Sequence, residues 1–262
     1  MTVHTFREGT PDGGLPIVLV HGFPLDHRMW LAAATSFPAN RAVLAVDLPG
    51  TPGHDRSLPE PSLDASADYV AEALAQAGVA RAVVVGMSMG GYVALALAER
   101  HPALVAALGM IDTKSTADTP EAYANRLRIA DEAEASGSVA PVRPMATTLV
   151  GVSTRAFRPV LSDEIAVWIE DQPPAGVAWS QRAMAARPDR TEILRAFTGP
   201  VTVLVGDEDA LTPLAAAEHM VAAATSAAST RLVVVPHAGH MAAFEQPDVV
   251  AMAVAELAAR AD

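Results

Sequence analysis

Short apolar runs alternate with stretches of helical periodicity at both ends of the chain. Because strands buried on both faces are apolar throughout, these runs predict the strands of a parallel sheet. The helical patterns between them predict helices on both faces of that sheet. The sequence therefore predicts an α/β fold with a mostly parallel, doubly wound sheet. The predicted strands are Val3 to Arg7 at one edge, Leu15 to Val20, Ala42 to Val46, Val83 to Val85, Leu104 to Ile111, Pro200 to Val205 and Arg231 to Val235.

The alternation of strands and helices stops after Asp112 and resumes at Pro200. The segment between them has mostly helical patterns, interrupted by prolines, and no strongly β-forming run. We therefore expect a helical cap, residues 113–198, inserted into a single core. Residues 1–112 and 199–262 form the two parts of that core.

Charge and composition narrow the possible partners. The 262 residues include 18 Lys and Arg against 30 Asp and Glu, a formal net charge of −12. This charge disfavours nucleic acids and anionic membrane surfaces as partners. There is no cysteine, which excludes disulfides, thiolate catalysis and Cys-ligated metal. Residues 1–14 lack a basic region followed by an apolar run, so no signal peptide is expected and a cytoplasmic location suits the chain.

The negative charge is concentrated outside the predicted cap. Residues 113–198 hold 10 Lys and Arg against 11 Asp and Glu, a net of −1, which leaves −11 for the rest of the chain. The cap is therefore the more favourable host for a substrate carboxylate, with Arg126, Arg128 and Arg143 as candidates. The alternative is that these arginines only solvate helix surfaces.

The pattern Gly-x-Ser-x-Gly stands between a predicted strand and a predicted helix, at Gly86 to Gly90. Such a turn holds its serine in a strained conformation, and the glycines avoid collisions with the neighbouring backbone. The pattern can occur by chance in a sequence rich in glycine and alanine. The strand before it and the helix after it favour the functional reading, in which Ser88 is a nucleophile.

Two backbone N–H groups are candidates for binding an oxyanion. The N–H of Met89 opens the helix after Ser88, where unpaired donors and the helix dipole favour negative charge. The strand ending at Val20 is followed by His21, Gly22, Phe23 and Pro24, so the N–H of Phe23 can point into a site above the sheet. An ordinary strand-to-helix turn is the alternative for this second segment.

A nucleophilic serine needs an imidazole to take its proton and a carboxylate to orient that imidazole. Ser88, Asp209 and His240 each follow a predicted strand. Because active sites of open α/β sheets lie beyond the carboxyl ends of the strands, we expect these three side chains to meet. Asp207 and Asp112 are alternative acids at the ends of strands.

These segments are together similar to those of the α/β-hydrolase superfamily, in particular its small esterase, enol-lactonase and cofactor-free haloperoxidase branch. The resemblance spans nearly the whole chain and is weakest in the cap. It rests on His21 to Pro24, Gly86 to Gly91, Gly206 to Asp209 with Pro213, and Gly239-His240 followed by Glu245 to Pro247.

The resemblance implies a role for each of these residues. Ser88 would be the nucleophile, His240 the base and Asp209 the acid, while the N–H groups of Phe23 and Met89 would form the oxyanion hole. The family position of the acid selects Asp209 over Asp207. No cofactor is implied, and no metal-binding spacing links the eight histidines.

The implied reaction is acyl transfer to water from a small, largely apolar carboxylic ester or lactone. Hydrolysis of a carbon–carbon bond, perhydrolysis or a hydroxynitrile-type lyase reaction could use the same three residues, and a non-catalytic receptor could use the same scaffold. We expect an apolar pocket, although any of its candidate residues could instead pack the cap onto the core. These candidates are Met87, Met145, Phe157, Trp168, Trp179 and Met184.

Polar residues outside these motifs have structural interpretations. Asp47 ends a predicted strand and is expected to tie down the polar loop at 51–57. His21 is expected to support the oxyanion segment, and His237 to be a loop histidine. His4 and His27 belong to no motif.

Overall fold

The computed structural model describes residues 2–54 and 57–262, so Asp55 and Arg56 of the predicted polar loop lie outside it. Its described residues form a sheet of seven strands in the order β1-β3-β2-β4-β5-β6-β7, in which β1 pairs antiparallel with β3 and the other pairs are parallel. The predicted fold class is thereby confirmed. The strands are β1 (Val3–Arg7), β2 (Ile17–Val20), β3 (Val43–Val46), β4 (Ala82–Met87), β5 (Val105–Ile111), β6 (Val201–Gly206) and β7 (Thr230–Val235).

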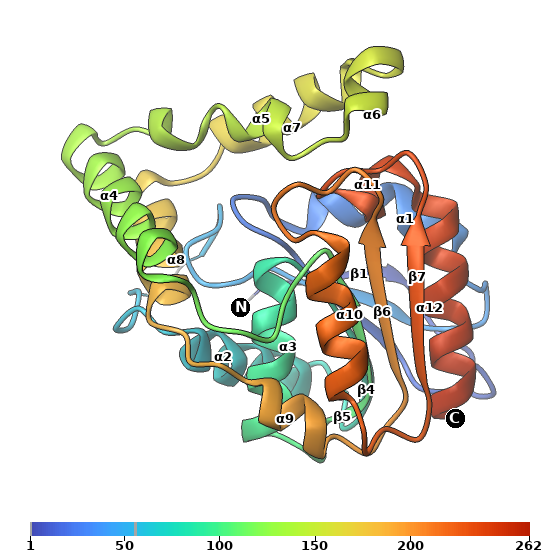
Figure 1. Cartoon of the computed structure of the whole chain (residues 1–262). Helices are drawn as coiled ribbons and strands as arrows, with labels where there is room; N and C mark the ends of the chain where they lie inside the picture. The colour runs from blue at the N-terminus through green and yellow to red at the C-terminus, as the bar shows by residue number, and fades with distance from the viewer. Residues whose placement is uncertain (1, 55–56) are drawn as a thin grey trace.

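Helices cover both faces of this sheet (Figure 1). On one face, α12 (Pro247–Ala261) packs against β4, β5 and β6 and also contacts α1 (Leu31–Ser36). On the other face lie α2 (Leu63–Gln76), α3 (Met89–Arg100), α9 (Thr191–Ala196) and α10 (Leu214–Ala223). Every residue of β2 to β6 is buried, which explains why these strands appear as unbroken apolar runs in the sequence.

A helical region is inserted between β5 and β6, as predicted. In Figure 1 its helices lie beyond one end of the sheet and along one side of it. The last helix of the segment, α9, packs instead against α3 and α10 of the core. The division of the chain at residues 112 and 198 stays a prediction. The inserted helices before α9 are α4 (Pro120–Ser136), η2 (Ala140–Val142), α5 (Met145–Thr148), α6 (Val152–Phe157), α7 (Val160–Glu170) and α8 (Pro174–Ala185).

Two local predictions differ from the structure. The sequence after the strand ending at Val20 predicts a helix near His27 to Phe37. The structure has a 3₁₀ turn there, η1 (His27–Trp30), followed by α1. In the sequence, Thr212 is a typical N-cap and Pro213 a typical first helical residue. The helix begins instead at Leu214, and Pro213 occupies the position that precedes it. The remaining short helix, α11 (Ala242–Glu245), lies just before α12. Among the described residues, none of the helices has the length and apolarity that a membrane span requires.

Candidate active site

Ser88 stands at a sharp corner between β4 and α3. Its backbone has φ 51° and ψ −113°, a conformation that residues other than glycine rarely adopt. The corner brings backbone segments so close that a Cβ atom at Gly86 would lie 2.1 Å from the carbonyl oxygen of Gly90, and one at Gly90 would lie 2.1 Å from that of Val20. Glycine is therefore required on both sides of the serine for steric reasons.

The three predicted catalytic side chains meet at the carboxyl ends of the strands. Nε2 of His240 lies 2.8 Å from Oγ of Ser88, and Nδ1 of His240 lies 2.8 Å from Oδ2 of Asp209. His240 follows β7, and Asp209 follows β6. The geometry allows Ser88 to donate its proton to Nε2 while the proton on Nδ1 is held by the carboxylate.

Thr212 is a member of this network that the sequence analysis did not find. Its hydroxyl donates to Oδ2 of Asp209 over 2.5 Å and lies 3.3 Å from Nδ1 of His240. Its N–H and that of Leu211 donate to Oδ1 of Asp209. Asp209 is therefore held by four hydrogen-bond donors, and Thr212 orients the acid instead of capping α10.

The pKa of Asp209 is lowered and the pKa of His240 is raised, because hydrogen bonds and charges outweigh the effect of burial in both residues. Burial alone raises the pKa of Asp209, but the hydrogen bonds and charge from His240 and the hydrogen bonds from Thr212 lower it below its ordinary value. Burial alone lowers the pKa of His240, but the hydrogen bond to Asp209 and the nearby carboxylates raise it above 6.5. The site thus favours the imidazolium that forms when Ser88 loses its proton.

The two alternative acids occupy different places. Asp207 is exposed and accepts a 3.4 Å hydrogen bond from the N–H of Ala238. Asp112 is fully buried, and its two oxygens accept the N–H groups of Gly206 and Ala242 over 2.9 Å each. Burial and the charge of Asp209 raise the pKa of Asp112 to about 7. Asp112 therefore links Gly206, which precedes the acid Asp209, to Ala242, which follows the base His240.

The two candidate oxyanion donors flank the serine. Within the described residues, neither the N–H of Phe23 nor that of Met89 has a hydrogen-bond acceptor. His21 supports this segment as expected, because its Nε2 accepts the N–H of Leu48 over 2.9 Å and its Nδ1 lies 3.0 Å from the carbonyl oxygen of Gly22. His237 is an exposed loop residue at φ 56°.

A cavity of about 340 Å³ opens at Ser88 and His240. Of the predicted apolar residues, Met145 and Met184 line it, together with Phe23. Its wall also contains polar and charged groups that the sequence analysis did not assign to the pocket. These are Tyr92, Lys114, Asp118, Asn125, Thr148, Gln181 and Thr212. Of the three cap arginines considered as partners for a substrate carboxylate, Arg126 lines the cavity.

The structure does not bring the other four predicted pocket residues to this cavity. Phe157 is 84% exposed and borders a separate surface hollow, which His237 and Gln246 also line. Trp168 packs against Phe244, and the indole N–H of Trp179 donates to the carbonyl oxygen of Pro59. Met87 is buried within the core. The last three residues therefore pack the structure together, which was the alternative interpretation.

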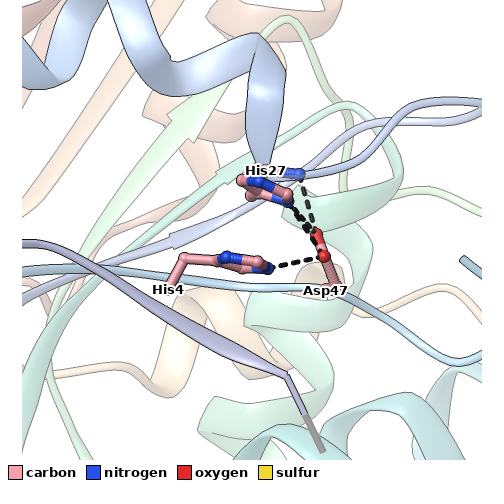
Figure 2. Close-up of side chains that lie close together, drawn as sticks. All are labelled: His4, His27 and Asp47. Carbon is pink, nitrogen blue, oxygen red and sulfur yellow. Dashed lines mark hydrogen bonds and ion pairs between the residues drawn. The ribbon is translucent and has the colours of Figure 1, made fainter. Parts of the chain in front are cut away.

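His4, His27 and Asp47 form a cluster that histidine spacing does not reveal, since they come from β1, η1 and the end of β3 (Figure 2). Nε2 of His4 and Nδ1 of His27 lie 2.8 Å and 2.9 Å from Oδ2 of Asp47. The ring centroids are 3.4 Å apart and the planes differ by 13°. A metal binds an imidazole nitrogen in the plane of the ring, so one ion does not fit two stacked rings.

The cluster is better described as a hydrogen-bonded tie between β1, η1 and β3. The backbone N–H of His27 also donates to Asp47, over 2.8 Å. Among the described residues, the hydrogen-bond partners of the Asp47 side chain lie on β1 and η1, which corrects the prediction that it ties the loop at 51–57. The structural role predicted for Asp47 holds, with different partners.

Known proteins are similar to this chain over most of its length. Residues 17–253 match the family described as the Alpha/beta hydrolase family. The pimeloyl-acyl-carrier-protein methyl ester esterase of Aromatoleum aromaticum is 29% identical over 253 residues, covering 92% of this chain and 97% of that protein. The structure of a thermophilic esterase from Thermogutta terrifontis with malate bound has a TM-score of 0.88 and 35% identity, covering 97% of this chain and 91% of that one.

One relative is longer than this chain. The dihydrolipoyllysine-residue acetyltransferase component of the acetoin cleaving system of Pseudomonas putida is 30% identical over 241 residues, which cover 91% of this chain. The match covers 62% of that protein, so the chain spans less than two thirds of its length. The family match over residues 17–253 confirms the resemblance seen in the sequence, and the chain belongs to the alpha/beta hydrolase family.

Proposed function

We propose that this protein is a serine hydrolase that cleaves a carboxylic ester or lactone through an acyl-enzyme on Ser88. The observation that carries the proposal is the continuous line of hydrogen bonds from Ser88 through His240 to Asp209, at 2.8 Å for each step. It ends at a strained corner beside two unpaired backbone donors. This arrangement supplies a nucleophile, a base, an orienting acid and a place for developing negative charge.

The reaction follows from these positions. Ser88 attacks the substrate carbonyl while its proton passes to Nε2 of His240, and the oxyanion accepts hydrogen bonds from the N–H groups of Phe23 and Met89. His240 then gives the proton to the leaving alkoxide, which departs as an alcohol. Water, deprotonated by His240, attacks the acyl-enzyme, and the acid is released as the proton returns to Ser88.

The comparisons support ester chemistry at the level of the class. Two similar proteins are described as esterases, one acting on a methyl ester. The size of the cavity suits a small-molecule substrate, since ligand sites of roughly 300 to 1,000 Å³ are typical. Its methionines and Phe23 offer an apolar wall for an acyl or alkyl chain.

The direct experiment compares wild-type protein with Ser88→Ala on a panel of short esters and lactones, alongside labelling by a fluorophosphonate probe. We expect covalent labelling of the wild type alone and a loss of turnover of roughly 10⁴- to 10⁶-fold in the variant. Esterase turnover that survives in Ser88→Ala would contradict the assignment of the nucleophile. A wild-type protein that neither labels nor turns over any ester would support the receptor alternative.

A further inference from the structure

The cavity beside Ser88 contains more positive than negative side chains. Lys114 and Arg126 line it, and Asp118 is the acidic residue among the described lining residues. The position of Lys114 is linked to the nucleophile through the chain, because the hydroxyl of the preceding residue, Thr113, donates to the carbonyl oxygen of Ser88 over 2.7 Å. These cations therefore belong to the same site as the candidate catalytic residues.

The carboxylate of Asp118 is shared among three cations. Arg187 donates to both of its oxygens, over 2.6 Å and 2.8 Å, and Nε of Arg126 donates over 2.6 Å. Nζ of Lys114 lies 3.4 Å away. The side chains of Arg187 and Asp118 are only 1% and 2% exposed, so this bidentate pair is shielded from water. One carboxylate against three cations leaves a surplus of two positive charges.

Among the described residues, Asp118 is the acidic partner of these three cations, and the centre of the Tyr92 ring also lies 4.0 Å from Cζ of Arg187. Nη1 of Arg126 contacts the neutral groups Oε1 of Gln181 and Sδ of Met184, at 3.2 Å each, and its Nη2 has no acceptor among the described residues. Burial and the charge of Arg187 lower the pKa of Lys114, which reflects the same crowding of positive charge. In a protein with a net charge of −12, this local surplus of positive charge favours an anion that enters the cavity.

We propose that Lys114 and Arg126 form a subsite for a carboxylate carried by the substrate, in addition to its scissile ester or lactone. This proposal rests on the proposed hydrolase function and specifies its substrate class: the half-ester of a dicarboxylic acid, a lactone that carries a free carboxylate, or a hydroxy acid acylated on its hydroxyl group. Arg126 would donate to the substrate carboxylate from Nη2, and Lys114 from its free ammonium hydrogens. Asp118, itself paired with Arg187, would hold these two side chains in place.

The other two arginines considered from the sequence provide matched controls. Arg128 is exposed and donates to Glu132 over 2.7 Å and to Asn125 over 2.8 Å. Arg143 is likewise exposed and pairs with Glu170. Both are cap arginines outside the described cavity lining, so their charge contributes to the surface and not to the subsite.

The kinetic test measures the ratio of kcat/KM for a monoethyl ester carrying a free carboxylate to kcat/KM for a neutral ester of similar length. Monoethyl succinate, monoethyl adipate and monoethyl suberate cover different distances from the scissile carbonyl, with ethyl heptanoate as a neutral partner for the adipate. We expect Arg126→Gln and Lys114→Gln each to lower this ratio about tenfold or more, the effect of losing one charge-assisted hydrogen bond. Arg128→Gln and Arg143→Gln should leave it unchanged.

A binding measurement separates failure of the subsite from failure of the hydrolase assignment. Isothermal titration calorimetry with adipate and suberate measures Kd for the wild type and each variant. We expect Kd to rise about tenfold in Arg126→Gln and Lys114→Gln only. Arg126→Lys retains the charge and should recover part of the binding and of the ratio. If the wild type turned over no ester or lactone, the hydrolase assignment would fail, whatever the titration showed. Equal ratios and equal binding in all four glutamine variants would overturn the subsite.

Discussion

The carboxylate of Glu245 accepts hydrogen bonds from the residues on both sides of His240. Its Oε1 accepts the N–H of Gly239 over 2.8 Å and that of Met241 over 3.2 Å. Its Oε2 accepts the N–H of Gly151, in the cap, over 2.8 Å. Glu245 is completely buried, so these three N–H groups take the place of the water that would otherwise solvate its carboxylate. It therefore positions the loop of the candidate base and joins that loop to the cap.

Glu245→Gln should reduce both stability and turnover. A glutamine amide can replace only one of the two oxygens, so its NH₂ group would face a backbone donor without an acceptor between them. We expect the free energy of unfolding to fall by about 2 kcal/mol in urea titrations. We also expect kcat to fall more than KM rises, since the base would be misplaced. Glu192→Gln, on an exposed side chain paired with Arg195, is the control and should change neither quantity.

The raised pKa of His240 predicts how activity depends on pH. Only the neutral imidazole can accept the proton of Ser88, so kcat/KM should fall as the pH falls through the pKa of His240. Because nearby carboxylates raise that pKa, the midpoint should lie above 6.5. A pH–rate profile of the wild type on an uncharged ester measures it. A midpoint clearly below 6.5 would contradict the description of this pair.

Asp112→Asn should move this midpoint to lower pH. Asp112 is charged above its own pKa of about 7, where its charge contributes to the raised pKa of His240, and the substitution removes that charge. The same substitution weakens the hydrogen bonds to Gly206 and Ala242, so stability must be measured separately. Asp207→Asn, on the exposed neighbour of the acid, should leave the midpoint in place. An unshifted midpoint in a folded Asp112→Asn would show that the two groups do not interact.

The strands and the corner at Ser88 were predictable because their signals are local. A buried parallel strand must be apolar along its length, and the close backbone contacts at Gly86 and Gly90 exclude side chains, so both leave a mark in consecutive residues. The order of strands in the sheet leaves no such mark. It depends on contacts between segments far apart in the sequence.

The cavity was predicted less well, for the same reason. Apolar type alone could not separate Met184, which lines the cavity, from Trp179, whose N–H is bound to Pro59, or from the exposed Phe157. The cluster around Asp118 forms only when α8 packs against α4, which brings Arg187 to Asp118. Thr212 showed a typical helix-capping pattern, and only the fold reveals that its hydroxyl binds Asp209.

Asp47→Asn should lower stability at neutral pH and much less in acid. Burial alone raises the pKa of Asp47, but hydrogen bonds from His27 and the charges of His21 and His27 lower it to about 2, from 3.8. A depressed folded-state pKa stabilises the fold above 3.8, and this contribution disappears as the pH falls through about 2. The shift corresponds to about 2 kcal/mol of unfolding free energy at neutral pH.

Urea unfolding of the wild type and Asp47→Asn near pH 7 and near pH 2 measures this difference. Asp68→Asn is the control, because Asp68 binds Arg100 and His101 on an exposed surface. Surface pairs contribute about 0 to 1 kcal/mol, so the control should have little effect at either pH. An equal loss of stability for Asp47→Asn at both pH values would mean that its ionisation is not the cause.

Gly86→Ala should be far more damaging than Gly137→Ala, although both replace one glycine by one methyl group. At Gly86 the new Cβ would lie 2.1 Å from the carbonyl oxygen of Gly90, so the backbone of the corner itself must shift. At Gly137, which ends α4 at φ 58°, no atom lies within 4 Å of the new Cβ and only the backbone conformation is unfavourable. We expect about 1 kcal/mol of destabilisation at Gly137 with unchanged hydrolase activity. At Gly86 we expect about 3 kcal/mol or more, together with loss of activity, because the shift displaces Ser88 from His240. Equal effects of the two substitutions would show that backbone conformation, and not contact at the corner, makes glycine necessary beside the serine.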